Sequence, residues 1–242
     1  MELKNKVALV TGAAGGIGSA IVTALTAAGA HVLAFDRDAA AVARLGAECE
    51  PVAADLADPE GAVAAVQDVL ARHGRIDILV NNAGILSPHK LAATTLEEWR
   101  RLMAVNLDAA FLLSQTVAPA MQANRWGRIV NIGSYAAKSG GLTAGTAYAV
   151  SKAALAGLTF SVARELASSG VTANAVAPAF VVSPMIMEQL SEEDRNRQLA
   201  AIPVGRLCEP EEVAHAVRFL ASPLSGFMTG VVLDMNGGLQ FG

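Results

Sequence analysis

The chain has 242 residues, of which 53% are apolar and 17% are charged, and its formal net charge is −4. A charged fraction well below the usual ~25% predicts that most of the sequence is buried, partly against a partner subunit, and it excludes a disordered protein. An isoelectric point near 5.6 and the lack of a basic run exclude electrostatic binding of nucleic acid or of an anionic membrane. With two cysteines and no disulfide framework, we expect a cytoplasmic protein with reduced thiols.

Short β-branched runs alternate with longer alanine-rich stretches along the chain, which predicts repeated βα units under a parallel sheet. We expect one α/β domain, residues 1–242, in which helices cover both faces of a doubly wound, seven-stranded parallel sheet. The expected strands are residues 6–11, 31–36, 50–54, 76–81, 128–132, 171–177 and 231–234. Asp58 followed by Pro59, and Thr95 with Glu98, are typical helix starts. No window holds about 18 uninterrupted apolar residues, so we predict no membrane span.

The first expected strand runs into a glycine-rich loop, Thr11 to Gly18, with the sequence TGAAGGIG. Glycines let the backbone turn tightly and approach a pyrophosphate, whose charge is stabilised by free N–H groups and by the positive end of the following helix. The spacing is G-x-x-x-G-x-G rather than the commoner G-x-G-x-x-G, and taken alone it also fits a tight turn in an alanine-rich sheet protein. The loop therefore favours dinucleotide binding but needs a second signal.

The second signal is Asp36, which ends the second expected strand eighteen residues after Gly18. A dinucleotide-binding fold places the acid that binds the adenosine ribose at this point. A carboxylate here accepts hydrogen bonds from the ribose of NAD and repels the 2′-phosphate of NADP, and Arg37 alone does not reverse that preference when Gly15 replaces a second cation. We therefore expect NAD as the cofactor, with NADP less favoured.

Tyr148 and Lys152 are four residues apart, so they lie on one face of a helix about one turn from each other. Taken alone, this pair is an ordinary helix surface. Ser134, however, follows the expected strand at 128–132, and the sequence NNAG at 81–84 ends another strand. Because polar groups just beyond the carboxyl ends of parallel strands lie where ligands bind, these residues together predict a catalytic site.

The chain resembles the short-chain dehydrogenase/reductase family, which has a Rossmann-like fold, over essentially its whole length. The resemblance rests on seven motifs in family order, namely TGAAGGIG, Asp55-Leu56, NNAG, Asn106, Ser134, YAVSK at 148–152 and NAVAP at 174–178. Seven motifs in order are far more specific than any one of them. The resemblance implies an oxidoreductase that transfers a hydride between a nicotinamide cofactor and a small-molecule substrate.

The resemblance also implies a role for each matching residue. Tyr148 would be the general acid/base, and the charge of Lys152 would favour its phenolate while the same side chain holds the nicotinamide ribose. Ser134 would hydrogen-bond the substrate oxygen, and Asn106 would hold a water that relays protons beyond Lys152. The implied cofactor contacts are Gly12, Gly15, Gly16, Ile17, Gly18, Asp36, Arg37, Asp55, Leu56, Asn82, Ala83, Gly84, Tyr148, Lys152, Pro178, Val181 and Ser183.

Two departures from the family pattern concern the substrate pocket. Ser134 and Tyr148 are fourteen residues apart, where thirteen is commoner, so the loop at 138–145 carries an extra residue. The family's proline-glycine pair appears as Pro178-Ala179. We expect a substrate lid at about 183–205 and a mostly small or apolar pocket, which fits a compact, uncharged ketone or secondary alcohol. The expected substrate contacts are Ser134, Gly141, Leu142, Tyr148, Met185 and His89.

Our first hypothesis for the function is an NAD(H)-dependent oxidoreductase that interconverts a secondary alcohol and a ketone. The first alternative is a 3-oxoacyl-carrier-protein reductase, which usually uses NADPH and presents arginines to an acidic carrier. Gly15 and Ser169 replace two of the arginines expected for that alternative, while Arg125 is retained. An alternative of another class, a non-catalytic dinucleotide-sensing regulator, has no need of the complete Ser/Tyr/Lys/Asn set, and a methyltransferase has no use for the Tyr/Lys pair.

Two further expectations concern assembly and metal binding. The resemblance implies a homotetramer in which helices at 96–122 and 146–168 pair across one two-fold axis, and their small and apolar residues suit close packing. The four histidines are His31, His73, His89 and His215. They lack metal-ligand spacing along the chain, so the sequence predicts no metal site.

Overall fold

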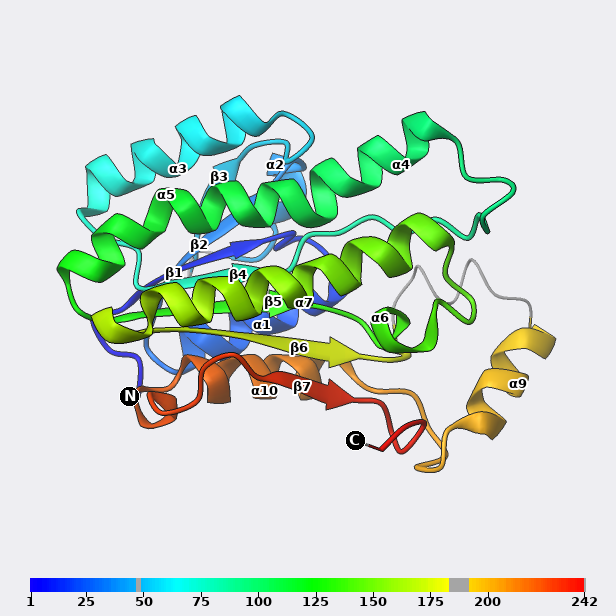
Figure 1. Ribbon diagram of the computed structural model, residues 1–242. Coiled ribbons are helices and arrows are strands. Elements are labelled where there is room, and N and C mark those ends of the chain that lie inside the picture. Colours follow the sequence, from blue (N-terminus) through cyan, green and yellow to red (C-terminus); the bar gives the residue numbers. More distant parts are fainter. Residues whose placement is uncertain (47–48, 183–191, 242) are drawn as a thin grey trace.

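The computed structural model describes residues 1–46, 49–182 and 192–241 (Figure 1). Seven parallel strands form one sheet in the order β3-β2-β1-β4-β5-β6-β7. The strands are β1 (Val7–Thr11), β2 (His31–Asp36), β3 (Cys49–Ala53), β4 (Ile78–Asn81), β5 (Gly127–Ile132), β6 (Val171–Pro178) and β7 (Val232–Met235). The predicted strands and the doubly wound α/β fold are confirmed, with strand bounds that differ by at most two residues.

The strand order reverses at β1, because β2 and β3 follow it on one side while β4 to β7 follow on the other. In open parallel sheets, ligands bind outside the carboxyl ends of the strands at such a reversal. The loops that follow β1 and β4 flank this point. The topology therefore places the glycine-rich loop beside the segment at 82–84, although some seventy residues separate them in the sequence.

Helices cover both faces of the sheet (Figure 1). They are α1 (Gly16–Ala27), α2 (Ala39–Ala43), α3 (Pro59–His73), α4 (Leu96–Met103), α5 (Ala109–Ala123), α6 (Ala136–Ser139), α7 (Thr146–Leu166), α9 (Glu192–Ala201) and α10 (Pro210–Ala221), with the 3-10 turns η2 (Ala167–Ser169) and η3 (Pro223–Ser225). One buried core lies between the sheet and α1 with α10, and a second lies between the sheet and α3, α5 and α7. Strands β1, β4, β5 and β6 are buried along their whole length, as strands covered on both faces must be.

The predicted helix starts are confirmed by side-chain caps. Asp58 Oδ1 accepts a hydrogen bond from the Gly61 N–H at 3.1 Å, and Thr95 Oγ1 accepts one from the Glu98 N–H at 3.2 Å. Glu209 at the start of α10 forms a further, reciprocal cap with the glutamate three residues later. Each cap satisfies N–H groups that have no partner within the helix, so it fixes where the helix begins.

The helices α4 and α5 are continuous, because the π-helical segment η1 (Ala104–Asp108) joins them into one helix over Leu96–Ala123. By length and composition alone this 28-residue helix could cross a membrane, and 39% of its most apolar window is buried. That is weak evidence for a span, since core helices pass the same test, and this helix packs on α3 and α7. For the site, its importance is that η1 carries Asn106.

Candidate active site

The loop between β1 and α1 requires glycine at two positions. Gly12 has a φ of +64°, and a Cβ there would lie 2.8 Å from the Cα of Ala83. A Cβ on Gly18 would lie 2.0 Å from the carbonyl oxygen of Gly12, which is closer than nonbonded atoms can approach. The helix α1 then begins without a side-chain cap and without an acidic residue in its first turn. Its free N–H groups and positive end therefore fit the pyrophosphate of a dinucleotide.

Four hydrogen bonds tie this loop to the segment that follows β4. Thr11 Oγ1 accepts hydrogen bonds from the backbone N–H groups of Asn82 at 3.0 Å and Ala83 at 3.1 Å. The Asn82 amide donates to the carbonyl oxygens of Thr11 at 2.9 Å and Gly12 at 3.1 Å. The two loops at the strand reversal are thus one hydrogen-bonded unit. Sequence reasoning assigned no role to Thr11. The feature that could have identified it is a hydroxyl group on the last residue of a buried strand.

A groove along the carboxyl ends of β1, β2 and β4 collects most of the predicted cofactor contacts. It is lined by Gly12, Gly15, Gly16, Ile17, Gly18, Asp36, Arg37, Asp55, Leu56, Asn82, Ala83 and Gly84. The Asp55 carboxylate is oriented at the groove by a hydrogen bond from the Ala57 N–H at 2.9 Å. The fold therefore brings these separate segments together, while their individual roles in cofactor binding stay predictions.

A pocket adjoins the groove and contains the predicted catalytic side chains. Its lining includes Ser134, Tyr148, Lys152, Pro178 and Val181. The groove and the pocket share Ile17, Asn82, Gly84 and Ile85. A dinucleotide that lies in the groove with its pyrophosphate at α1 can therefore extend its other end to the pocket.

Tyr148 and Lys152 lie on one face of α7, as their spacing predicts, with Lys152 Nζ 5.8 Å from the centre of the Tyr148 ring. The Lys152 ammonium donates a hydrogen bond to the carbonyl oxygen of Ile132, the last residue of β5, at 2.7 Å. Ser134 hydrogen-bonds to the Tyr148 side chain, and its Oγ accepts a hydrogen bond from the Ala136 N–H at 3.1 Å. The end of β5 and the face of α7 therefore hold these three side chains at one wall of the pocket.

Burial dominates the protonation of both titratable groups. It raises the pKa of the Tyr148 phenol, although the hydrogen bond with Ser134 acts in the opposite direction. Burial also lowers the pKa of Lys152 to about 8. At neutral pH the phenol therefore keeps its proton while the ammonium stays mostly charged, which suits a proton donor backed by a cation.

Asn106 is 2% exposed and links two parts of the site. Its Oδ1 accepts a hydrogen bond from the Ile85 N–H at 2.8 Å, and its Nδ2 donates to the Ile85 carbonyl and to Ser151 Oγ, both at 3.0 Å. The Ser151 hydroxyl in turn donates to the carbonyl oxygen of Tyr148 at 2.8 Å. Asn106 therefore connects the segment after β4 with α7, and the relay water expected at this residue stays a prediction. Ser151 was not singled out from the sequence, where its place between Tyr148 and Lys152 is the signal.

The expected substrate contacts separate into three groups. Ser134, Leu142 and Tyr148 line the pocket. His89 and Gly141 are not among the described lining residues. The His89 imidazole instead contacts Glu98, with Nδ1 3.0 Å from both carboxylate oxygens, and the Gly141 carbonyl accepts a hydrogen bond from Lys90. Ser183, Met185 and the first part of the lid expected at 183–205 lie outside the described residues.

Lys90 holds the loop that forms one wall of the pocket. Its Nζ donates hydrogen bonds to the carbonyl oxygens of Gly141, of Leu142 at 3.2 Å and of Ala144 at 2.6 Å. Leu142 and Ala144 themselves line the pocket, so the ammonium fixes the position of that wall. Sequence reasoning assigned no role to Lys90, although it directly follows the expected substrate contact His89. The signal that it missed is a cation that can reach a glycine-containing loop with free carbonyl groups.

Comparisons with known proteins agree with this geometry. The family model described as Enoyl-(Acyl carrier protein) reductase matches residues 12–240. The 3-oxoacyl-[acyl-carrier-protein] reductase FabG of Vibrio cholerae is 43% identical over 244 residues, which cover 99% of each chain. Among solved structures, a candidate NAD(P)-dependent gluconate 5-dehydrogenase from Beutenbergia cavernae is 43% identical with a TM-score of 0.90 over 98% of each chain. A 3-oxoacyl-[acyl-carrier protein] reductase from Brucella melitensis is 35% identical with a TM-score of 0.93, over 100% of this chain and 93% of the other.

The expected preference for NAD is wrong. The Beutenbergia cavernae structure, 43% identical to this chain, holds NADP at low occupancy, which conflicts with that preference. The physical reason lies in the surroundings of Asp36. Its Oδ2 accepts a hydrogen bond from the Ala14 N–H at 3.1 Å and its Oδ1 accepts one from the Asp38 N–H at 3.2 Å, so two backbone N–H groups offset part of the negative charge that was expected to repel a 2′-phosphate. The exposed Arg37 lies at the same groove and offers a cation for a 2′-phosphate.

The family assignment thus has three independent supports. The sheet reverses its strand order beside a glycine-rich loop, and the pocket next to that loop holds the Ser, Tyr and Lys side chains. The similarity to curated and solved relatives extends over nearly the whole chain. The chain therefore belongs to the short-chain dehydrogenase/reductase family and is an oxidoreductase.

Proposed function

We propose that this protein reduces the keto group of 3-oxoacyl chains carried on an acyl carrier protein, using NADPH. The observation that carries the proposal is the pocket in which Tyr148 keeps its proton beside Ser134 and Lys152, because a protonated phenol serves the reductive direction. Relatives at 40–43% identity that are named 3-oxoacyl-[acyl-carrier-protein] reductase support the substrate class.

The proposed roles follow from the positions of the side chains. The nicotinamide cofactor, when bound, supplies the hydride for the keto carbon. Ser134 and Tyr148 donate hydrogen bonds to the keto oxygen and stabilise the negative charge that develops there. Tyr148 then gives its proton to that oxygen, which yields the hydroxyl group and leaves a phenolate. The Lys152 ammonium stabilises this phenolate, and a proton from solvent restores the phenol.

The pocket walls support an uncharged, partly apolar substrate. Leu86, Leu142, Phe180 and Val181 line the pocket together with small residues, and Lys152 is the charged side chain among the described lining residues. Lys152 is 4% exposed and donates a hydrogen bond to the Ile132 carbonyl, and the proposed roles direct its charge to the Tyr148 phenolate rather than to a substrate carboxylate. An acyl chain that ends in a thioester loses little on entering such a pocket, whereas an ionised substrate would lose its hydration without compensation.

Recognition of the acyl carrier protein through Arg125 would require two neighbouring protomers. Arg125 is exposed and donates a hydrogen bond from Nη2 to the Ser168 carbonyl at 3.1 Å. It precedes β5, so it lies at the amino ends of the strands and away from the pocket of its own protomer. A carrier docked at one pocket could therefore meet Arg125 only on a neighbouring protomer.

The test is a comparison of substrates under matched conditions. NADPH oxidation is followed with acetoacetyl carrier protein, acetoacetyl-coenzyme A, a small cyclic ketone and a keto sugar acid. We expect the highest kcat/KM for the carrier-bound substrate, with the coenzyme A thioester second. Efficient turnover of the keto sugar acid without turnover of either thioester would contradict the proposal and favour the activity named for the Beutenbergia cavernae relative.

The proposed use of NADPH rests on Arg37 and is tested separately. A charge-assisted hydrogen bond to a phosphate contributes about 1.5–3 kcal/mol, so Arg37→Ala should raise the KM for NADPH by about 10–100-fold and leave the KM for NADH nearly unchanged. Arg44→Ala is the matched control, because Arg44 lies beyond α2 and is not among the described groove residues. An equal change in KM for both cofactors would contradict this role of Arg37.

We also propose that the protein is a homotetramer. Phe111 on α5 and Phe160 on α7 are 47% and 51% exposed, although both belong to helices that pack on the sheet. Phe241 and Phe227 near the C-terminal strand are exposed as well. Pairing of the two helices across one axis and of the C-terminal region across another would bury these side chains. Light scattering at micromolar concentration should give about four times the 24.8 kDa chain mass, and a stable monomer would contradict the proposal.

A further inference from the structure

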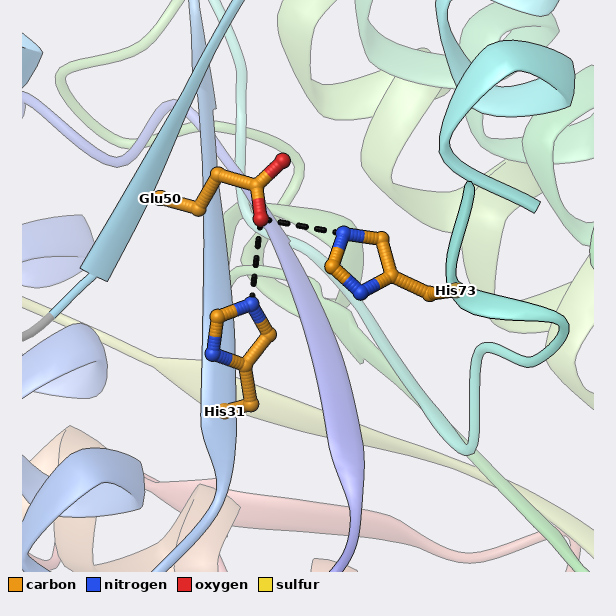
Figure 2. Close-up of side chains that lie close together, drawn as sticks. All are labelled: His31, Glu50 and His73. Carbon is orange, nitrogen blue, oxygen red and sulfur yellow. Dashed lines mark hydrogen bonds and ion pairs between the residues drawn. The ribbon is translucent and has the colours of Figure 1, made fainter. Parts of the chain in front are cut away.

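Two histidines and a glutamate from three different elements meet at the amino ends of the strands (Figure 2). His31 begins β2, Glu50 lies on the edge strand β3, and His73 ends α3. Glu50 Oε2 lies 3.1 Å from His31 Nε2 and 2.9 Å from His73 Nε2. Both imidazole nitrogens thus lie close to the same carboxylate oxygen. The spacing of these residues along the chain gave no sign of this cluster, because strand pairing and the return of α3 create it.

The other oxygen of Glu50 is held by a second layer of charges. Arg72 Nη1 donates a hydrogen bond to Glu50 Oε1, and Arg72 Nε donates to Asp68 Oδ2 at 2.9 Å. The two imidazole rings are tilted by 35° with their centres 5.1 Å apart. The carboxylate is therefore oriented before any ligand binds, with Oε2 left for the two histidines. Because Asp68 offsets the charge of Arg72, the cluster with neutral imidazoles carries a net negative charge.

We propose that His31, Glu50 and His73 bind a divalent transition-metal ion of the Zn²⁺ class through His31 Nε2, Glu50 Oε2 and His73 Nε2. These three ligand atoms lie within 4.8 Å of one another. Ligands at about 2.1 Å from a tetrahedral Zn²⁺ are separated by about 3.4 Å. The two contacts of Glu50 Oε2, at 3.1 Å and 2.9 Å, therefore have to lengthen by a few tenths of an ångström, and the two imidazole nitrogens, which lie within 4.8 Å of each other, have to come to about 3.4 Å. The ion replaces the His31–Glu50 hydrogen bond and the close His73–Glu50 contact with two nitrogen–metal bonds, which requires each imidazole to carry its proton on Nδ1.

The chemistry of the three ligand atoms determines which ion fits, and the exposure of their side chains determines what supplies the fourth ligand. Two imidazole nitrogens and one carboxylate oxygen suit Zn²⁺, Co²⁺ or Ni²⁺, whereas Mg²⁺ and Ca²⁺ prefer oxygen ligands throughout. The His31 side chain is 48% exposed and those of Glu50 and His73 are 25% and 23% exposed, so water can supply the fourth ligand.

The position of the site assigns it to stability rather than to hydride transfer. His31 and Asp36 stand at opposite ends of the six-residue strand β2, so the cluster lies roughly 16 Å from the cofactor groove at about 3.3 Å per residue. A bound ion would join the edge strand β3 to β2 and to the end of α3. It should therefore stabilise the fold, because it binds the three elements only when they are assembled.

The test uses Zn²⁺ and Co²⁺ with the full, metal-free chain. Calorimetry should give one Zn²⁺ per chain, and Co²⁺ should give the visible absorption of a tetrahedral ion. His31→Gln, Glu50→Gln and His73→Gln should each weaken Zn²⁺ binding by more than about 10-fold. Replacing a residue that only hydrogen-bonds to a metal ligand typically costs at least that much affinity, so replacing a ligand should cost more. His215→Gln, an exposed histidine on α10, is the matched control and should bind Zn²⁺ as the wild type does.

A second measurement separates loss of the site from loss of the fold. Saturating Zn²⁺ should raise the Tm of the wild type and of His215→Gln but not that of the cluster variants, while turnover without metal is the same in all of them. If the double variant His31→Gln/His73→Gln binds Zn²⁺ as tightly as the wild type, or if the wild type binds no Zn²⁺, the cluster is an ion-pair network only and the proposal is overturned.

Discussion

The two ends of the sheet use polar side chains in opposite ways. At the carboxyl ends, the amides of Asn82 and Asn106 bind backbone groups of neighbouring loops, and a groove and a pocket remain open between them. At the amino ends, Asp77 pairs with Arg75 at 2.7 Å and accepts a hydrogen bond from a strand N–H. Arg128, which is 3% exposed, donates to three backbone carbonyls there.

This difference shows that charge alone does not identify the functional end of a sheet. More charged side chains are paired at the amino ends, yet these side chains bind one another or backbone groups and, within the described residues, leave no open cavity between them. The carboxyl ends use neutral amides and hydroxyls that position the backbone around an open cavity. Variants at the carboxyl ends should therefore lower turnover with little effect on unfolding, and variants at the amino ends should do the reverse.

The largest expected effect is that of Tyr148→Phe, which removes only the proton donor. Turnover should fall by about 10²–10⁴-fold, the contribution typical of a positioned general acid, while thermal unfolding and NADPH binding stay nearly unchanged. Steady-state NADPH oxidation and fluorescence titration measure the two quantities. Tyr135→Phe is the control, because Tyr135 lines the same pocket but is not the tyrosine that precedes Lys152 on α7. Normal turnover of Tyr148→Phe would refute the proposed proton transfer.

At the amino ends, Asp77→Asn should lower the free energy of unfolding without changing turnover. Asp77 is 1% exposed, and the change removes its charge from Arg75 and from Lys6, which lies 3.9 Å away. We expect a loss of about 2–3 kcal/mol, measured by urea denaturation. Asp68→Asn is the control, since Asp68 also pairs with an arginine but is 67% exposed, and it should cost at most about 0.5 kcal/mol. Equal losses in the two variants would contradict the contrast drawn between buried and exposed pairs.

Lys152 is the exception that sharpens the comparison, because it is a buried cation at the carboxyl ends. Its pKa is lowered by burial to about 8, from 10.5 in the unfolded chain. Between these values the unfolded chain binds more protons, so the free energy of unfolding should rise with pH. Lys152→Met lacks this titration and should be more stable than the wild type at pH 7.5. That advantage should shrink by about 2 kcal/mol between pH 8 and pH 10. An advantage that does not change with pH would contradict this interpretation.

The smallest expected effect is that of Lys90→Met, which frees the pocket loop. Losing the hydrogen bonds to the carbonyls of Leu142 and Ala144 should raise the KM for the keto substrate by about fivefold to tenfold and change kcat less, an effect of roughly 1 kcal/mol. Lys90→Arg retains a cation with several donors and should recover part of the loss. Lys4→Met, near the amino ends of the strands, should have no effect on KM. A larger fall in kcat than rise in KM would assign Lys90 to the chemical step instead.

The sequence was sufficient for the parts of the molecule that depend on local patterns. Apolar β-branched runs predict the strands, and Asp58 and Thr95 predict helix starts. The spacing of the glycines predicts the loop whose conformation requires Gly12 and Gly18. The residues that line the groove could also be predicted, because a parallel topology brings the carboxyl ends of the strands together. These predictions need only the order of elements and the chemistry of single residues.

Predictions that depend on partners across the fold could not be made in this way. The sequence locates Asp36 at the end of β2, but it does not show that the Ala14 N–H binds the carboxylate, so the cofactor prediction failed. It places Lys90 near the pocket without showing the carbonyls that it binds. Likewise, His31 and His73 are 42 residues apart, and only the packed structure places them on one carboxylate.

The π-helical segment at Ala104–Asp108 has a consequence for how the length of this chain can change during evolution. A residue added to or removed from an α-helix rotates everything beyond it by about 100°. Loss of one residue from this segment would restore a regular helix and turn α4 by that angle while α5 stays packed on the sheet. Glu98 on α4 would then lose the Ser87 hydroxyl that donates to it. Insertions and deletions should therefore be absent from 96–123 among natural variants, although exposed loops elsewhere in the same chain tolerate them.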